Sequence, residues 1–234
     1  MRKYLAIVLG AFMLIGGFAY EVHLARVKHA SPALAESAFA ALGGVRAIIA
    51  EVVWFRADRL QEEGRYVELR QLAETLTLLE PHTPEIWSYA AWNLAYNISI
   101  MMPTDEDRWR WVEAAIRLLR DRGLKFNPGS REICRELAWL FELKLGGKLD
   151  QAAPTFRTKW KAIVEDVKSR DAWEEIGMEK SKMDEIERIT GFNDWADPQM
   201  SAMYWAKEGG FTDIFTQAKI IYQRTHNMIQ YKAL

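Results

Sequence analysis

The chain has 234 residues, half of them hydrophobic, and its 31 basic and 32 acidic residues leave a net charge of −1. This composition supplies a sizeable buried core and excludes a disordered chain. The sequence has no basic excess and no local basic cluster, so it does not favour nucleic acid as a partner. The single cysteine, Cys134, excludes intrachain disulfides, paired-cysteine redox motifs and cysteine-rich zinc sites, and we expect it to pack as a small apolar residue.

The N-terminal residues predict a membrane segment. Residues 4–20 form an uncharged apolar run after Arg2 and Lys3, close to the shortest length that spans a bilayer as a helix. We therefore interpret residues 1–22 as a single-pass transmembrane anchor. The basic start indicates a cytoplasmic N-terminus in the bacterial inner membrane, with the helical domain in the periplasm. A signal peptide cleaved near Ala19 is the alternative, and it leaves the domain on the same side.

Small residues mark one face of this segment. Ala6 and Gly10 are four residues apart, and Gly17 lies two turns further along the same face. This spacing lets two transmembrane helices approach closely. We hypothesise that the face docks against a neighbouring transmembrane helix; the other interpretation is that glycine and alanine are simply common in short spans.

Residues 23–49 are interpreted as a linker and a lead-in helix. The helix is expected over about 32–42, because Ser31 can cap it and Pro32 suits its first position. Gly43 and Gly44 end it.

The next stretch predicts two helices joined by a tight turn. Apolar residues recur with helical spacing over 45–63, Gly64 interrupts the pattern, and a second apolar run covers 69–79 before Pro81. In a unit that begins at Ala50, Gly64 and Tyr66 are the fifteenth and seventeenth residues. This pattern resembles the tetratricopeptide repeat (TPR), a helix-turn-helix unit of about 34 residues with a small residue and an aromatic at those positions.

A second hairpin is expected after Pro81. Its helices cover about 84–100 and 106–122, with Thr83 and Thr104 as N-terminal caps. Gly123 and Asn127 are expected to close it.

The rest of the chain predicts two more hairpins and a charged segment between them. Ser130 caps a helix that turns at Gly146 and Gly147, and the following helix begins or kinks at Pro154. Residues 165–198 are rich in charge with sparse apolar positions, which predicts an exposed helical insertion or a lid. The last hairpin covers 199–234 and turns at Gly209-Gly210.

The resemblance to the TPR superfamily covers residues 50–158, with a weaker echo over 200–231. The whole chain looks like uncharacterised bacterial membrane-anchored TPR-like proteins. This implies an all-α fold in which an N-terminal transmembrane helix precedes an α-solenoid of TPR-like helical hairpins, three over 50–164 and one over 199–234. The insertion after Ile100, Pro154 and the charged segment depart from the family pattern and put a smooth superhelix in doubt.

The resemblance also implies a binding groove. TPR grooves are lined by the second, fifth, ninth and twelfth residues of each first helix, which here are Glu51, Trp54, Asp58, Gln61, Glu85, Ser88, Trp92, Ala95, Glu132, Arg135, Trp139 and Glu142. Three tryptophans and five acids favour an extended peptide with basic and apolar side chains. The alternative is that the acids are solvated and the tryptophans pack under neighbouring repeats.

The sequence carries no motif for catalysis. Its four histidines are not spaced as metal ligands, no phosphate-binding glycine loop or HExxH motif occurs, and we expect neither a cofactor nor an enzyme. We expect a non-enzymatic, membrane-anchored protein-binding scaffold that helps to assemble or stabilise an envelope or membrane complex. The alternative is an integral structural subunit of a multi-subunit membrane energy-converting complex, and an enzyme ranks third.

Overall fold

The computed structural model describes residues 51–53, 55–147 and 150–232, and the chain divides into two compact units, Met1–Val52 and Val53–Leu234. Every regular element among the described residues is a helix, which confirms the all-α prediction for this part of the chain. Several predictions concern residues outside the described part of the chain: the anchor (1–22) with Ala6, Gly10 and Gly17, the lead-in region (23–49), and the groove residue Trp54. Among the helices that are described, none has both the length and the apolar composition that crossing a membrane requires.

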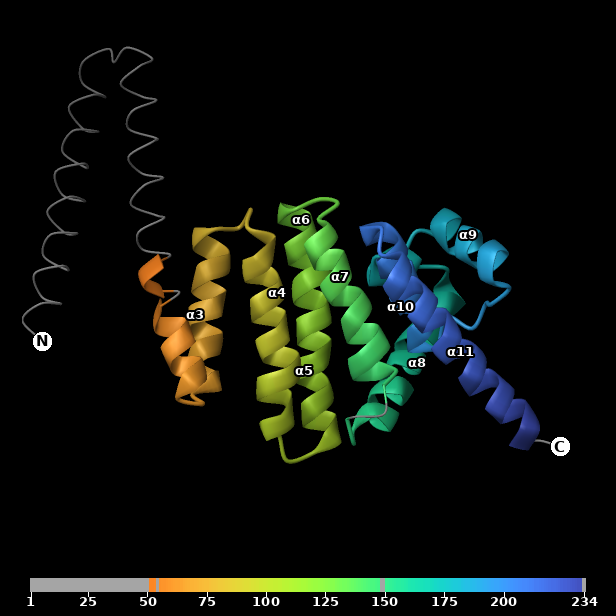
Figure 1. Cartoon of the computed structure of the whole chain (residues 1–234), viewed down its shortest axis with the longest axis horizontal. Coiled ribbons are helices and arrows are strands. Elements are labelled where there is room, and N and C mark those ends of the chain that lie inside the picture. Colours follow the sequence, from red (N-terminus) through yellow and green to blue (C-terminus); the bar gives the residue numbers. More distant parts are fainter. Residues whose placement is uncertain (1–50, 54, 148–149, 233–234) are drawn as a thin grey trace, which may run out of the picture. The chain divides into compact units, whose positions relative to one another are not determined.

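Successive helices of the second unit run in opposite directions (Figure 1). A helix over 55–62 precedes α3 (Tyr66–Leu79), and α4 (Pro84–Trp92) continues through η1 (Asn93–Ile98) and η2 (Ser99–Met101). The next helix consists of α5 (Asp105–Arg117), η3 (Leu118–Gly123) and α6 (Leu124–Phe126). A third pair consists of α7 (Arg131–Trp139) with η4 (Leu140–Leu145), and α8 (Ala153–Arg170). Segments η1, η3 and η4 are π-helical, a conformation that proteins use rarely and mostly for a single turn.

The structure places Thr83, Thr104 and Ser130 at the predicted N-cap positions, but only the last two cap the helix with their side chains. The Thr104 hydroxyl accepts a hydrogen bond from Asp107 N at 3.1 Å, and the Ser130 hydroxyl accepts one from Ile133 N at 3.4 Å. The Thr83 hydroxyl instead donates to a carboxylate oxygen of Glu80 at 3.2 Å. The Thr83 backbone carbonyl accepts from the amide of Ile86, which satisfies one of the free amides of the first turn.

Gly123 was expected to close the second hairpin, but the helix continues through it to Phe126. The glycine is there because of packing: a Cβ atom on it would lie 3.1 Å from Ile133 Cδ1 and 3.5 Å from Trp87 Cβ. The helix ends at Asn127, whose side-chain amide donates to the carbonyl of Gly123 at 3.1 Å. Pro154 lies in the first turn of α8, which confirms that this helix begins there rather than kinks.

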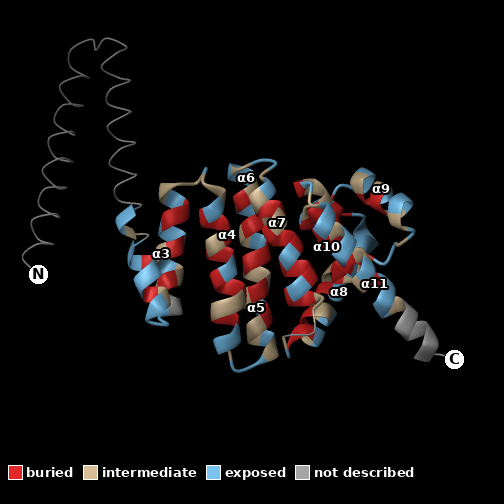
Figure 2. Ribbon diagram, viewed as in Figure 1, coloured by how far each residue is buried: buried red, intermediate tan, exposed pale blue. Residues whose placement is uncertain are grey.

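The C-terminal part of the unit contains η5 (Trp173–Ile176), α9 (Lys180–Thr190), α10 (Pro198–Gly209) and α11 (Thr212–Lys232). Helix α10 packs against α7 and α11 and is buried along most of its length (Figure 2). The expected exposed segment 165–198 differs from the structure in two respects. Helix α8 continues past residue 165, where the segment was expected to begin, and ends at Arg170. The apolar side chains of Trp173, Met183 and Trp195 are buried in the main core.

A buried ion cluster closes the turn between η4 and α8. Lys144, which is 3% exposed, places its Nζ 2.6 Å from Asp150, and Arg108 of α5 lies 2.9 Å from the same carboxylate. Burial alone would raise the pKa of Asp150, but the hydrogen bond from Lys144, the amide of Ala152 and the two positive charges together lower it. The carboxylate is therefore ionised at neutral pH and offsets the charge of the buried lysine.

We predict that Asp150→Asn destabilises the fold by about 3–5 kcal/mol, because it leaves the Lys144 charge buried without a counter-charge. Asparagine keeps an oxygen that can accept from the amide of Ala152, but its NH2 group replaces the oxygen that lies 2.6 Å from Lys144 Nζ. The change therefore removes both the negative charge and the hydrogen bond from the lysine. The measurement is urea denaturation followed by circular dichroism. The matched control is Asp184→Asn, whose partner Lys180 is exposed and which should cost less than about 1 kcal/mol. Equal losses for the two variants would contradict the argument.

Candidate functional site

Of the groove residues expected from the sequence, those that the structure describes lie on the first helix of each pair, but they are unequally accessible. Asp58 and Gln61 lie on the helix before α3; Glu85, Ser88 and Trp92 lie on α4, with Ala95 in η1; Glu132, Arg135 and Trp139 lie on α7, with Glu142 in η4. Glu51, in the first unit, is exposed, as are Asp58 and Glu85. Ser88, Ala95 and Glu142 are buried and cannot contact a partner in this conformation.

Trp92 and Trp139 are the exposed tryptophans among the described residues, at 39% and 37% exposure. Each is the ninth and last residue of its helix, α4 and α7 respectively. These two helices pack against each other. Two large aromatic side chains therefore occupy the same position on neighbouring helices, and both retain accessible surface.

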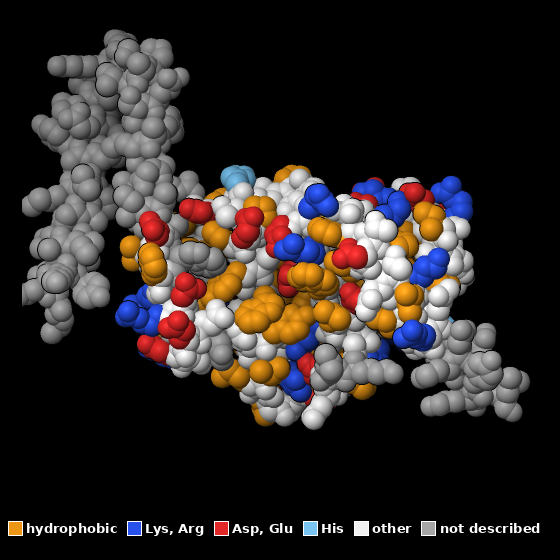
Figure 3. All heavy atoms as spheres, in the orientation of Figure 1, with side chains coloured by type: hydrophobic (Ala, Val, Ile, Leu, Met, Phe, Trp, Pro, Cys, Tyr) orange, Lys and Arg blue, Asp and Glu red, His pale blue; other side chains and the backbone are white. Residues whose placement is uncertain are grey.

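Each of the two indoles is held by a neighbour on its own helix. Trp92 stacks on Tyr96 with ring centroids 6.1 Å apart, and the Arg135 guanidinium lies 5.1 Å from the ring centroid of Trp139. Arg135 is also ion-paired with Glu132. Figure 3 shows hydrophobic side chains gathered near the middle of the unit, with acidic and basic side chains around them. The exposed ring of Trp139 therefore lies beside a charged pair on its own helix, and the exposed ring of Trp92 lies beside a second aromatic ring.

Glu136 is a buried carboxyl on α7 that the sequence interpretation missed. It follows Ile133 by three residues and precedes Leu140 by four, and all three side chains are buried. That helical spacing is the signal that could have identified it. Burial raises the pKa of Glu136 to about 7; Glu132 adds to this effect and Arg135 opposes it. This carboxyl therefore changes its charge near neutral pH.

The question for chemistry is whether the described residues offer a metal-binding cluster or a reactive thiol. No group of three or more His, Cys, Asp or Glu residues within them is placed to hold a metal ion. Cys134 is buried as expected, and burial raises the pKa of its thiol to about 11. The thiol is therefore protonated at neutral pH and is a poor nucleophile.

No family model matches the chain, and no curated protein and no solved structure matches it. Function must therefore be argued from the geometry of the chain itself.

We predict that Glu136 lowers the stability of the fold above neutral pH. Below its ordinary value of 4.5 the carboxyl is protonated in both states and its burial has no ionisation cost. Between 4.5 and about 7 the unfolded chain ionises while the folded chain keeps its proton, so stability falls as pH rises. The full loss above pH 7 is about 3 kcal/mol.

The measurement is the free energy of unfolding of Glu136→Gln and of wild type at pH values from below 4.5 to above 7. The variant should match wild type in acid and become more stable than it by a few kcal/mol in mild alkali, since glutamine does not ionise. Glu174→Gln, at an exposed position, is the control and should follow wild type throughout. A constant difference between Glu136→Gln and wild type across this range would contradict the assignment.

Proposed function

We propose that the helical unit is a non-enzymatic protein-binding scaffold built from TPR-like hairpins, with its binding surface around Trp92 and Trp139. The observation that carries this proposal is the exposure of both indoles at the same position of two packed helices. A large apolar side chain is costly to leave in water, and tryptophan is enriched among the residues that contribute most to protein interfaces.

Charge on the same helices favours a partner with basic as well as apolar side chains. Glu85 is exposed on α4, and Glu132 on α7 is ion-paired with the arginine that covers Trp139. A lysine or arginine of an extended peptide can pair with Glu85, and apolar side chains of the same peptide can pack against the indole rings. The proposed partner is therefore an extended basic and apolar peptide segment, supplied by another protein or by a subunit of a membrane complex.

The proposal includes membrane attachment through residues 1–22, with the helical unit on the periplasmic face of a bacterial inner membrane. It is supported by the apolar run over 4–20 and by the basic residues before it. An anchor of this kind raises the local concentration of the unit at the membrane, so modest contacts at the tryptophan surface suffice for binding.

The double substitution Trp92→Ala with Trp139→Ala should reduce the amount of co-purifying partner at least about ten-fold, because it removes two anchoring side chains. The full-length protein, tagged at its C-terminus, is gently solubilised from native membranes, and the recovered proteins are quantified by mass spectrometry. A partner set recovered at substoichiometric and variable amounts indicates a scaffold. A fixed stoichiometric set that survives the substitutions would indicate an integral subunit.

The matched control is Leu78→Ala, which removes an apolar side chain that is 70% exposed. Leu78 lies on α3, the second helix of its pair, whereas Trp92 and Trp139 lie on first helices. It should leave recovery unchanged. Circular dichroism of the double variant must show an unchanged helix content. Recovery that falls equally in the control and the double variant would count against the tryptophan surface.

A further inference from the structure

A cavity of about 330 Å³ lies between α3, α4 and α5, lined by residues that the predicted groove does not include. This volume is at the lower end of the range for small-ligand sites. Ala73 of α3, Ala90 of α4 and Ala114 of α5 supply part of its lining. Because an alanine side chain is a single methyl group, three of them leave space where larger side chains would fill the gap between helices.

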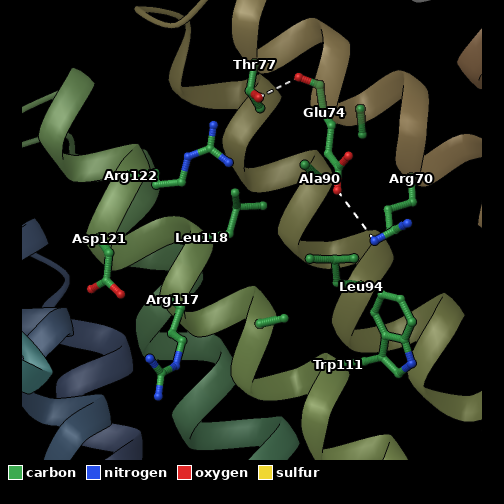
Figure 4. A pocket seen from close by; sticks show the side chains of 12 residues that line it. Arg70, Glu74, Thr77, Ala90, Leu94, Trp111, Arg117, Leu118, Asp121 and Arg122 are labelled. Atoms are coloured by element: carbon green, nitrogen blue, oxygen red, sulfur yellow. Dashed lines mark hydrogen bonds and ion pairs between the residues drawn. The ribbon is translucent and has the colours of Figure 1, made fainter.

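The rest of the apolar lining comes from Leu94, Trp111 and Leu118. Leu94 belongs to the π-helical segment η1 and Leu118 to η3. Segments of this kind occur frequently at functional sites. In Figure 4, Arg122 extends from η3 toward Thr77 of α3, while Arg70 lies beside Trp111 at the opposite end, with the two leucines between them. The cavity is therefore an apolar space with a guanidinium group at either end.

Most charges around the cavity are offset by neighbours. Arg70 pairs with Glu74 at 3.6 Å, and Asp121 accepts two hydrogen bonds from Arg120. Arg117 pairs with Glu113 at 2.6 Å, and Arg117 and Asp121 also line a neighbouring cavity between α5 and α8. The acids at the rim thus have cations of their own.

Arg122 is the exception among these charges. Its guanidinium lies 5.6 Å from the ring centroid of Trp87, and no carboxylate in the part of the chain described here lies within ion-pair distance of it. At the other end, the buried Nε of Arg70 lacks a hydrogen-bond partner among the described residues. A buried donor without a partner is unusual in a folded protein and requires an explanation. Arg122 at one end and the Arg70 Nε–H group at the other can each donate a hydrogen bond to an anionic oxygen.

We propose that this cavity binds a small amphipathic carboxylate, with its apolar body against the alanines, leucines and Trp111 and its carboxylate on Arg122. The planar guanidinium suits a carboxylate because it can donate two parallel hydrogen bonds. A neutral apolar molecule would leave Arg122 without its counter-charge, and an amphipathic cation would be repelled by it. The site is separate from the tryptophan surface and does not depend on the function proposed for that surface.

The test uses phenylbutyrate as the probe and phenylbutanol as its neutral analogue. Each is titrated calorimetrically into the full-length protein in lipid nanodiscs, with empty nanodiscs as the blank. We expect phenylbutyrate to bind with a dissociation constant on the order of 0.1 mM, as a ligand of this size can reach. Phenylbutanol should bind at least about ten-fold more weakly, because it lacks the charge that pairs with Arg122.

Three variants locate the binding. Arg122→Gln should weaken phenylbutyrate binding about ten-fold and leave phenylbutanol unaffected. Ala114→Leu should abolish binding of both by filling the cavity. Arg110→Gln, at an exposed arginine of α5 outside the lining, should match wild type. Circular dichroism shows whether each variant is folded, and Arg122→Gln, at an exposed position, decides the matter if Ala114→Leu does not fold.

Three results would overturn the proposal. The first is the absence of phenylbutyrate binding to the folded wild type above the blank. The second is phenylbutyrate binding that is unchanged in Arg122→Gln, and the third is equal binding of the acid and the alcohol.

Discussion

The backbone carbonyl of Pro81 joins two helix pairs, and the arrangement of the unit depends on it. It accepts hydrogen bonds from Trp87 Nε1 at 2.9 Å and from Asn127 Nδ2 at 2.8 Å. The turn before α4 is thereby bonded to the start of α4 and to the end of α6. Trp87 is fully buried, and its ring stacks on Phe126 with centroids 5.7 Å apart. Because these contacts satisfy the polar atoms at the joint and fill the space between the pairs, they fix how α4 is rotated about its own axis.

That rotation determines what each face of α4 presents. Trp92 follows Trp87 by five residues, which places the two side chains about 140° apart around a helix. Burying Trp87 at the joint therefore turns Trp92 outward, where it remains exposed beside Tyr96. The same buried ring also positions Arg122, whose guanidinium lies over it. One packed indole thus sets both the proposed protein-binding surface and the cation at the end of the cavity.

Local signals were enough to predict the helices and several of their ends. Hydroxyl caps at Thr104 and Ser130 and the proline near the start of α8 act within one turn, so neighbouring residues determine them. Features that depend on distant contacts could not be predicted in this way. Gly123 is a helix breaker by type but a packing residue in fact, because Trp87 and Ile133 press against it. Because residues 165–198 are rich in charge, the sequence predicted an exposed segment, although its tryptophans are buried. Nothing in the sequence indicated that three alanines from three helices would line one cavity.

Glu136 connects the stability of the fold with the selectivity proposed for its surface. It precedes Trp139 by three residues, so the two side chains lie along the same side of α7. Burial penalises its ionised form, and a positive charge placed nearby reduces that penalty because opposite charges favour ionisation. A basic side chain bound over Trp139 would therefore recover part of the free energy that ionised Glu136 removes from folding, whereas a neutral side chain would recover none. One buried carboxyl thus weakens the isolated fold above neutral pH and, through the same electrostatic interaction, would favour the proposed basic partner over a neutral one.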